Sequence, residues 1–287
     1  MSLVLFDVPG PKAARRHRII GALTVVGLIA IVTAVVWKLW TEDQFTAAKW
    51  EPFVTPSIIE LLVDGLIATL KAAFIAIIFA FVVGVLFGVG KMSDHRLVRW
   101  PAWLVVEFFR AVPLLMLIIF IWALQGYPLG TITPLVLGLI LYNGSVIAEI
   151  VRAGVNAVPK GQAEAAYSIG MRKSQVMRII QLPQAIKIML PSLISQFIVV
   201  LKDTSLGFVI LAPGLTFSGR EIYRTFDNRL ATALVLAAIY VIINLLLTYL
   251  ATALQRRFGG ESRIDLVGDI VQSRPGADAG AAVGPEH

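Results

Sequence analysis

The sequence contains no cysteine and only three histidines, and this scarcity excludes several kinds of chemistry. Without cysteine the chain forms no disulfide, no thiolate metal site and no cysteine nucleophile. The histidines His17, His95 and His287 all lie outside the apolar runs, and neither an HExxH metal motif nor a GxSxG nucleophile elbow occurs. We therefore expect no metal site and no catalysis by this chain.

A nucleotide-binding loop is missing as well. The segment from Gly88 to Lys91 superficially resembles a phosphate loop, but no glycine stands five residues before Gly90, and Met92 takes the place of the required Ser or Thr. The chain is therefore expected to bind no ATP and no other cofactor. An active transporter built on it must take its energy from another polypeptide or from an ion gradient.

Charged residues are also scarce, at 15% of the 287 residues, whereas 57% are hydrophobic and the mean hydropathy is +0.81. One soluble core cannot bury so much apolar surface, so the composition predicts an all-α membrane protein. A helix needs about 20 apolar residues to cross the hydrocarbon layer. Six segments meet this requirement: 19–36, 65–89, 102–124, 134–151, 186–211 and 230–254.

The net charge of +7 follows from loop residues rather than from a nucleic-acid site. Basic residues gather in alternate loops, and this bias predicts that both termini lie in the cytoplasm. The predicted inside set is Lys12, Arg15, Arg16, Arg18, Lys91, Arg96, Arg99, Lys160, Arg172, Lys173, Arg178, Arg256, Arg257 and Arg263. The outside set is Lys49, Arg220, Arg224 and Arg229.

The chain divides by composition into a core and two ends. Residues 1–18 form a basic arm, and residues 19–40 a retained transmembrane helix that ends in an aromatic belt. Residues 57–254 form the transmembrane core, which opens with a short interfacial helix over 58–64. Residues 259–287, rich in Gly, Ala and Pro, are predicted to be disordered.

The loop between the fourth and fifth spans, residues 156–183, is long for a simple connector. Pro159 is suited to start a helix, and Gly170 to end it in a left-handed cap. A second helix is predicted over 174–180, with Pro183 breaking it. A helix-turn-helix of this kind is a peg on which a soluble partner can dock.

The same loop resembles the EAA loop of ABC importer permeases at every position of that signature. In that family the loop inserts into a groove of the ATPase subunit and transmits its closure to the membrane helices. The resemblance assigns this coupling role to Gly161, Glu164, Ala165, Ala166, Gly170, Ile180, Leu182 and Pro183.

Four further elements resemble the permeases for polar amino acids, the histidine, glutamine and glutamate group. They are Gly65-Leu66-x-x-Thr69-Leu70, Glu107-x-Phe109-Arg110-x-x-Pro113-Leu114-Leu115, Ala148-Glu149-Ile150-x-Arg152 and Lys202-Asp203-Thr204-Ser205-Leu206. Two departures from the group are the extra first helix and Ser195, which stands where Asn is common.

Ionisable residues inside spans are candidates for function, because burying a charge in lipid is costly. Glu107 and Arg110 lie three apart on one helix, as do Glu149 and Arg152, so each pair can form a salt bridge. We favour a structural or gating role for both pairs over substrate contact.

A second set of polar residues lies where a translocation pathway needs them: Lys71, Lys202, Asp203, Thr204 and Ser205. A cation and an anion suit the two charges of an amino acid. The alternatives are equally open: Lys71 snorkels, the 202–203 segment packs a helix bend, and the hydroxyls bond to their own helix.

The sequence thus predicts the permease subunit of an ATP-binding-cassette importer for glutamate, glutamine or a basic amino acid. As the resemblance implies, its partners are ATPase subunits that bind ATP and Mg²⁺, a second permease protomer of the same or a related chain, and an external solute-binding protein. The expected location is a bacterial cytoplasmic membrane. The alternative is an ion-gradient-driven transporter or channel, which leaves the EAA-type loop without a purpose.

Overall fold

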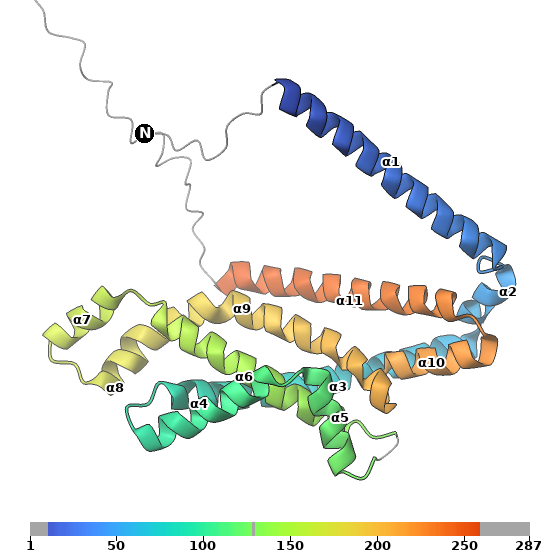
Figure 1. The fold of residues 1–287 in the computed structure, drawn as a ribbon. Helices are drawn as coiled ribbons and strands as arrows, with labels where there is room; N and C mark the ends of the chain where they lie inside the picture. Colours follow the sequence, from blue (N-terminus) through green and yellow to red (C-terminus); the bar gives the residue numbers. More distant parts are fainter. Residues whose placement is uncertain (1–10, 128–129, 259–287) are drawn as a thin grey trace, which may run out of the picture. The chain divides into compact units, whose positions relative to one another are not determined.

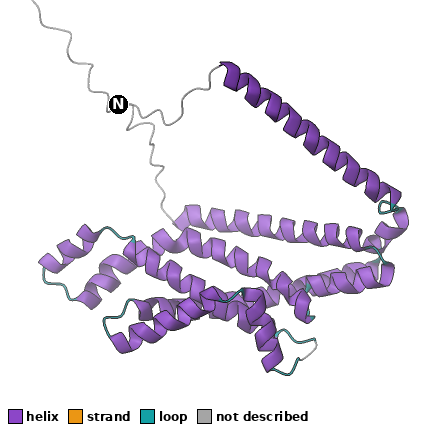
Figure 2. Ribbon diagram, in the orientation of Figure 1, coloured by secondary structure: helices purple, strands orange, loops and turns teal. Residues whose placement is uncertain are grey.

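The computed structural model describes residues 11–127 and 130–258, and within these ranges all regular structure is helical (Figure 1, Figure 2). The all-α prediction is confirmed. The elements are α1 (Pro11–Thr41), α2 (Ala47–Trp50), η1 (Glu51–Val54), α3 (Pro56–Lys91), α4 (Arg96–Ala111), α5 (Leu114–Leu124), α6 (Thr133–Asn156), α7 (Lys160–Ser168), α8 (Lys173–Gln175), η2 (Val176–Gln181), α9 (Leu182–Asp203), η3 (Thr204–Ile210), α10 (Leu215–Phe226) and α11 (Arg229–Phe258). The predicted tail, 259–287, lies outside the described residues, as does the first part of the predicted arm.

The predicted number of spans agrees with the helices of the described chain. Five helices are long and apolar enough to cross a membrane, and a sixth span results if α4 and α5 together count as one. The other five are Arg15–Thr41, Pro56–Lys91, Thr133–Asn156, Lys173–Ile210 and Arg229–Ala253. None of the described side chains in the first of these, within α1, is buried, so its apolar surface suits contact with lipid.

The third predicted span, 102–124, is wrong as a single straight helix. α4 and α5 meet at an angle of 102°. Val112 adopts an extended conformation, with ψ at 128°, and Pro113 follows it. The proline ring excludes the helical conformation at the preceding residue and removes one backbone N–H, so the helix ends here.

Two predicted boundaries near the start of the chain are also wrong. The expected interfacial helix over 58–64 is the first part of one continuous helix, α3, which starts at Pro56. Proline suits the first turn of a helix, and no breaker separates this turn from the apolar run. Residues 11–18 of the predicted arm likewise belong to α1.

The chain divides into two compact units, each described here by itself. The first comprises Met1–Phe74, Ile118–Val136 and Asp203–Ile242. Its core is formed by buried Leu62, Leu215 and Ile222, against which residues of α11 pack. The hydroxyl of Thr69 in α3 accepts a hydrogen bond of 2.9 Å from the backbone N–H of Leu215, so α3 is tied to the start of α10.

The second unit comprises Ile75–Leu117, Leu137–Lys202 and Ile243–His287. Here α3 and α6 approach so closely that glycine is required. A Cβ atom on Gly84 would lie 2.4 Å from Cγ2 of Ile147, and one on Gly88 would lie 2.9 Å from the carbonyl oxygen of Ala148. The two glycines stand four residues apart in α3, the GxxxG spacing that lets two helices approach closely.

A buried polar contact joins α6 to α9 in the same unit. Gln196 donates a hydrogen bond of 2.6 Å to the side-chain oxygen of Asn143, which is fully buried. The neighbouring Ser195 donates only to the carbonyl of Pro191 on its own helix.

Candidate functional site

The first half of the loop between α6 and α9 is α7, whose end is fixed by hydrogen bonds. Gly170 has φ of +83° and donates its N–H to the carbonyl of Tyr167, and Met171 donates to that of Ala166. These two bonds form a Schellman motif, in which the left-handed residue satisfies carbonyls that the helix leaves free. The predicted left-handed cap at Gly170 is confirmed, as is the start of the helix directly after Pro159.

The second half of the loop differs from the prediction, because Pro183 does not end a helix. α8 continues into the π-helical segment η2 and then into α9, with Pro183 in the first turn of α9. The wider π turn has i→i+5 hydrogen bonds, so the N–H that proline lacks is not needed there. The loop is therefore a single α7 helix and turn, followed by a helix that runs directly into the membrane span.

The tip of this loop exposes both polar and apolar side chains. α7 packs on η2, where Ala166 and Val176 are buried. Glu164 and Ala165 remain exposed, and Ile169 at the turn is 79% exposed. Among the other residues of the EAA-type signature, Gly161, Leu182 and Pro183 are exposed and Ile180 is half-buried. Ile169 is therefore an apolar side chain left exposed at the tip of a capped helix.

An ion pair joins this loop to the turn between α3 and α4. Lys173 at the start of α8 contacts both carboxylate oxygens of Asp94. The hydrogen bond from Lys173 and its positive charge lower the pKa of Asp94 below its ordinary value. No local pattern in the sequence indicated this contact, since the two residues stand 79 positions apart.

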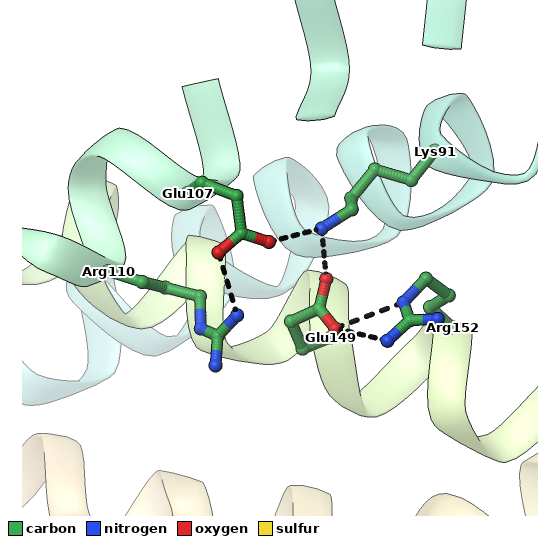
Figure 3. Close-up of polar contacts among 5 residues, drawn as sticks. All are labelled: Lys91, Glu107, Arg110, Glu149 and Arg152. Atoms are coloured by element: carbon green, nitrogen blue, oxygen red, sulfur yellow. Dashed lines mark hydrogen bonds and ion pairs between the residues drawn. The ribbon is translucent and has the colours of Figure 1, made fainter. Parts of the chain in front are cut away.

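The charged residues of the third and fourth spans form one network with Lys91 (Figure 3). The two predicted pairs are present. Arg110 approaches Glu107 at 3.4 Å, and Arg152 donates two hydrogen bonds, of 3.0 and 2.8 Å, to one oxygen of Glu149. Lys91 lies between the carboxylates and binds both, at 2.9 Å from Glu107. One ammonium group thereby joins α3, α4 and α6.

Lys91 was predicted to be a loop charge that sets topology, and this interpretation is wrong. It is the last residue of α3, and its side chain is only 5% exposed. The ammonium is buried because two carboxylates compensate for the loss of water. The available signal was a lysine at the end of a predicted span, together with one glutamate on each of the next two spans.

Two cavities lie against this network. One, of about 490 Å³, is lined by Lys91, Arg99, Trp100, Trp103, Glu107 and Arg152. The other, of about 400 Å³, is lined by residues of α4, α6 and α9 that include Arg110, Glu149 and Ser192. The second cavity is therefore lined by one cation and one anion, each of which is paired within the network.

The remaining predicted pathway residues have different environments, and each is described within its own unit. Lys71 and Lys202 are exposed on α3 and α9 respectively. Asp203 and Ser205 are half-buried where α9 gives way to η3. Thr204 is buried beside Tyr240, which also adjoins Thr69.

Known proteins match this chain over most of its length. A family model described as "Binding-protein-dependent transport system inner membrane component" matches residues 76–260. The glutamate transport system permease protein GluD of Corynebacterium glutamicum is 40% identical over 237 residues, which cover 79% of this chain and 86% of that protein. The arginine transport system permease protein ArtQ of Bacillus subtilis is 30% identical over 206 residues, 69% of this chain and 93% of that protein.

A solved structure agrees with these relatives. The crystal structure described as that of an amino acid ABC transporter with histidines matches with a TM-score of 0.66 and 34% sequence identity. The match covers 69% of this chain and 94% of that chain.

Proposed function

This chain belongs to the family of binding-protein-dependent transport system inner membrane components, and we propose that it carries polar amino acids into the cell as the permease of an ATP-driven importer. It is a multi-pass membrane protein of an ABC importer family. We further propose that separate ATPase subunits drive it, and that an external solute-binding protein and a second permease protomer complete the transporter. We also propose that both termini lie in the cytoplasm, which the charge bias of the loops supports.

The observation that carries the proposal is the geometry of α7 and its turn. The Schellman motif at Gly170 fixes the direction of the tip, and Glu164 and Ile169 stand exposed on it. We propose that this tip enters a groove of the ATPase subunit. Because η2 and α9 follow without an intervening loop, movement of the tip reaches the membrane span directly.

Two variants at one position test the coupling role. Gly170→Val forces a β-branched residue into the left-handed region, at a cost of about 1 to 2 kcal/mol or more. Gly170→Asn is the matched control, because Asn tolerates this conformation. We expect the Val variant to insert into the membrane but to lose uptake and binding-protein-stimulated ATP hydrolysis together, while the Asn variant keeps both.

The measurement is made in liposomes that contain the permease, its ATPase and its binding protein. Glu164→Lys, which reverses an exposed charge on the tip, is expected to weaken co-purification of the ATPase. Wild-type hydrolysis and uptake in both Gly170→Val and Glu164→Lys contradict the assignment of residues 160–183. A transporter driven by an ion gradient, the alternative function, would purify without an ATPase.

Glutamate is the first substrate to test. The relative named for glutamate shares 40% identity with this chain, whereas the relative named for arginine shares 30%. Uptake of labelled glutamate is measured in the presence of excess unlabelled glutamate, glutamine or arginine. The degree of inhibition ranks these amino acids as substrates. Stronger competition by arginine than by unlabelled glutamate contradicts an acidic substrate.

We propose that the substrate pathway passes Lys202 and Asp203, together with Lys71, Thr204 and Ser205. The exposed ammonium of Lys202 and the half-buried carboxylate of Asp203 support this, since a free amino acid carries both opposite charges. Lys202→Met and Asp203→Asn are expected to impair uptake and to leave assembly with the ATPase intact. Normal transport by both variants would assign these charges to helix packing instead.

The charge pairs of α4 and α6 are proposed to be structural or gating elements. The network fixes α4 against α6 through Lys91, while the cavity beside Arg110 and Glu149 offers the substrate a route past it.

A further inference from the structure

The cavity beside Lys91 carries more positive charge than its own carboxylates neutralise. The network holds three cations, Lys91, Arg110 and Arg152, against the two anions Glu107 and Glu149. Arg99 lines the same cavity and adds a further positive charge. The nearby carboxylate of Asp94 is bound by Lys173. The cavity therefore has a surplus of positive charge available to an anion.

Arg99 is the cation with the most donors to spare. Within the described residues its guanidinium makes a single hydrogen bond, a long one of 3.5 Å to the carbonyl of Ser93. The Arg152 guanidinium, by contrast, already gives two hydrogen bonds to Glu149 and keeps 43% of its side chain exposed. A guanidinium offers five N–H donors in a planar fork that matches phosphate geometry.

The helix that carries Arg99 also carries a face suited to lipid. Leu97, Trp100, Leu104 and Phe108 recur at helical spacing along α4, and all are exposed, with Leu97 at 91%. Trp100 and Trp103 lie together at the cavity, with ring centroids 6.0 Å apart. Tryptophan concentrates at the membrane–water interface, where its ring meets the headgroups. The cationic cavity and the apolar stripe therefore meet along one helix.

We propose that this cavity binds the phosphate of an anionic phospholipid headgroup, with the acyl chains lying along the exposed apolar stripe of α4. Its volume of about 490 Å³ falls within the range of small-molecule sites. Arg99 and Arg152 contact the phosphate, and Trp100 and Trp103 cover the headgroup from the side of the bilayer. Basic pockets between membrane helices recognise headgroups by the same chemistry.

Native mass spectrometry of the permease–ATPase complex tests the proposal. Phosphatidylglycerol, phosphatidylcholine and inorganic phosphate are titrated separately, so that a lipid headgroup is distinguished from a free anion. We expect phosphatidylglycerol to bind in preference to phosphatidylcholine, and inorganic phosphate to displace none of it. Arg99→Gln should weaken phosphatidylglycerol binding by about five-fold, the effect of one basic residue near an anionic headgroup.

Two further variants separate this site from general surface charge. Arg99→Lys keeps the charge and should restore most of the affinity, which also excludes misfolding as the cause of the loss. Arg96→Gln removes a charge from the same turn of α4 without lining the cavity, and should bind phosphatidylglycerol like the wild type. Equal binding of the two lipids, equal losses in Arg96→Gln and Arg99→Gln, or binding of inorganic phosphate as tight as that of the lipid would each overturn the proposal.

Discussion

Replacing Lys91 by Met is expected to destabilise the protein, because it removes the one cation shared by two carboxylates. Glu149 keeps its two bonds from Arg152, but its other oxygen loses its partner in a side chain that is only 17% exposed. Glu107 is 38% exposed and keeps Arg110 at 3.4 Å, so water replaces part of that loss. Removing one partner of a fully buried ion pair costs about 3 to 5 kcal/mol. Since Glu107 is partly exposed to water, we expect Lys91→Met to lower the free energy of unfolding by about 2 to 3 kcal/mol.

The assay measures the unfolding of the permease in detergent micelles, induced either by heating or by titration with denaturant. Lys71→Met is the matched control, because Lys71 lies exposed on the same helix and has no ion pair within the described residues. It should change the free energy of unfolding by no more than about 0.5 kcal/mol.

A double-mutant cycle isolates the contact itself. Glu149→Gln should be less destabilising in the Lys91→Met background than in the wild type, because the carboxylate it removes has already lost its ammonium partner. Coupling between directly paired residues falls in the range of about 0.5 to 3 kcal/mol. If Lys91→Met costs no more than Lys71→Met, or if the cycle shows no coupling, Lys91 does not hold the three helices together.

Two further predictions concern packing and pH. Gly84→Ala should destabilise the protein by about 1 to 3 kcal/mol in the same unfolding assay, because the added Cβ would lie 2.4 Å from Ile147. Gly21→Ala is the control and should not destabilise it, because a Cβ there meets nothing within 4 Å. Equal effects of the two variants would contradict the close approach of α3 and α6. Because the pKa of Asp94 is lower in the folded protein, its ion pair stabilises the fold above an unfolded pKa of about 3.9 and is lost as pH falls through the folded pKa. The Asp94 pKa, followed by carboxyl carbon-13 NMR, should rise in Lys173→Met, and an unchanged value would contradict the pairing.

Regularities of local sequence predicted much of this architecture. Long apolar runs indicated the spans, the three-residue spacing indicated the pairs Glu107–Arg110 and Glu149–Arg152, and Gly170 indicated a left-handed cap. Each of these features depends on residues close together in the chain, for which helical geometry fixes the distances.

The features that the sequence did not predict depend on residues far apart in the chain. Lys91 stands 58 positions before Glu149, and no periodicity links them. The predictions for Pro113 and Pro183 were wrong in opposite senses. Pro113 stops a helix that was expected to continue, while Pro183 stands in a helix that was expected to stop. Whether a proline breaks a helix depends on how the preceding turn is hydrogen-bonded, which composition does not specify.

The π-helical segment η2 sets the rotational phase between α8, at the end of the loop, and α9. A π turn accommodates one residue more than an α turn, and each residue of an α-helix rotates the chain by about 100°. Deleting a single residue from Val176–Gln181 would leave the helix unbroken but turn α8 by about that angle relative to α9. The length of this segment therefore determines the direction in which α7 and α8 point, and a change of one residue would alter that direction while α9 keeps its register.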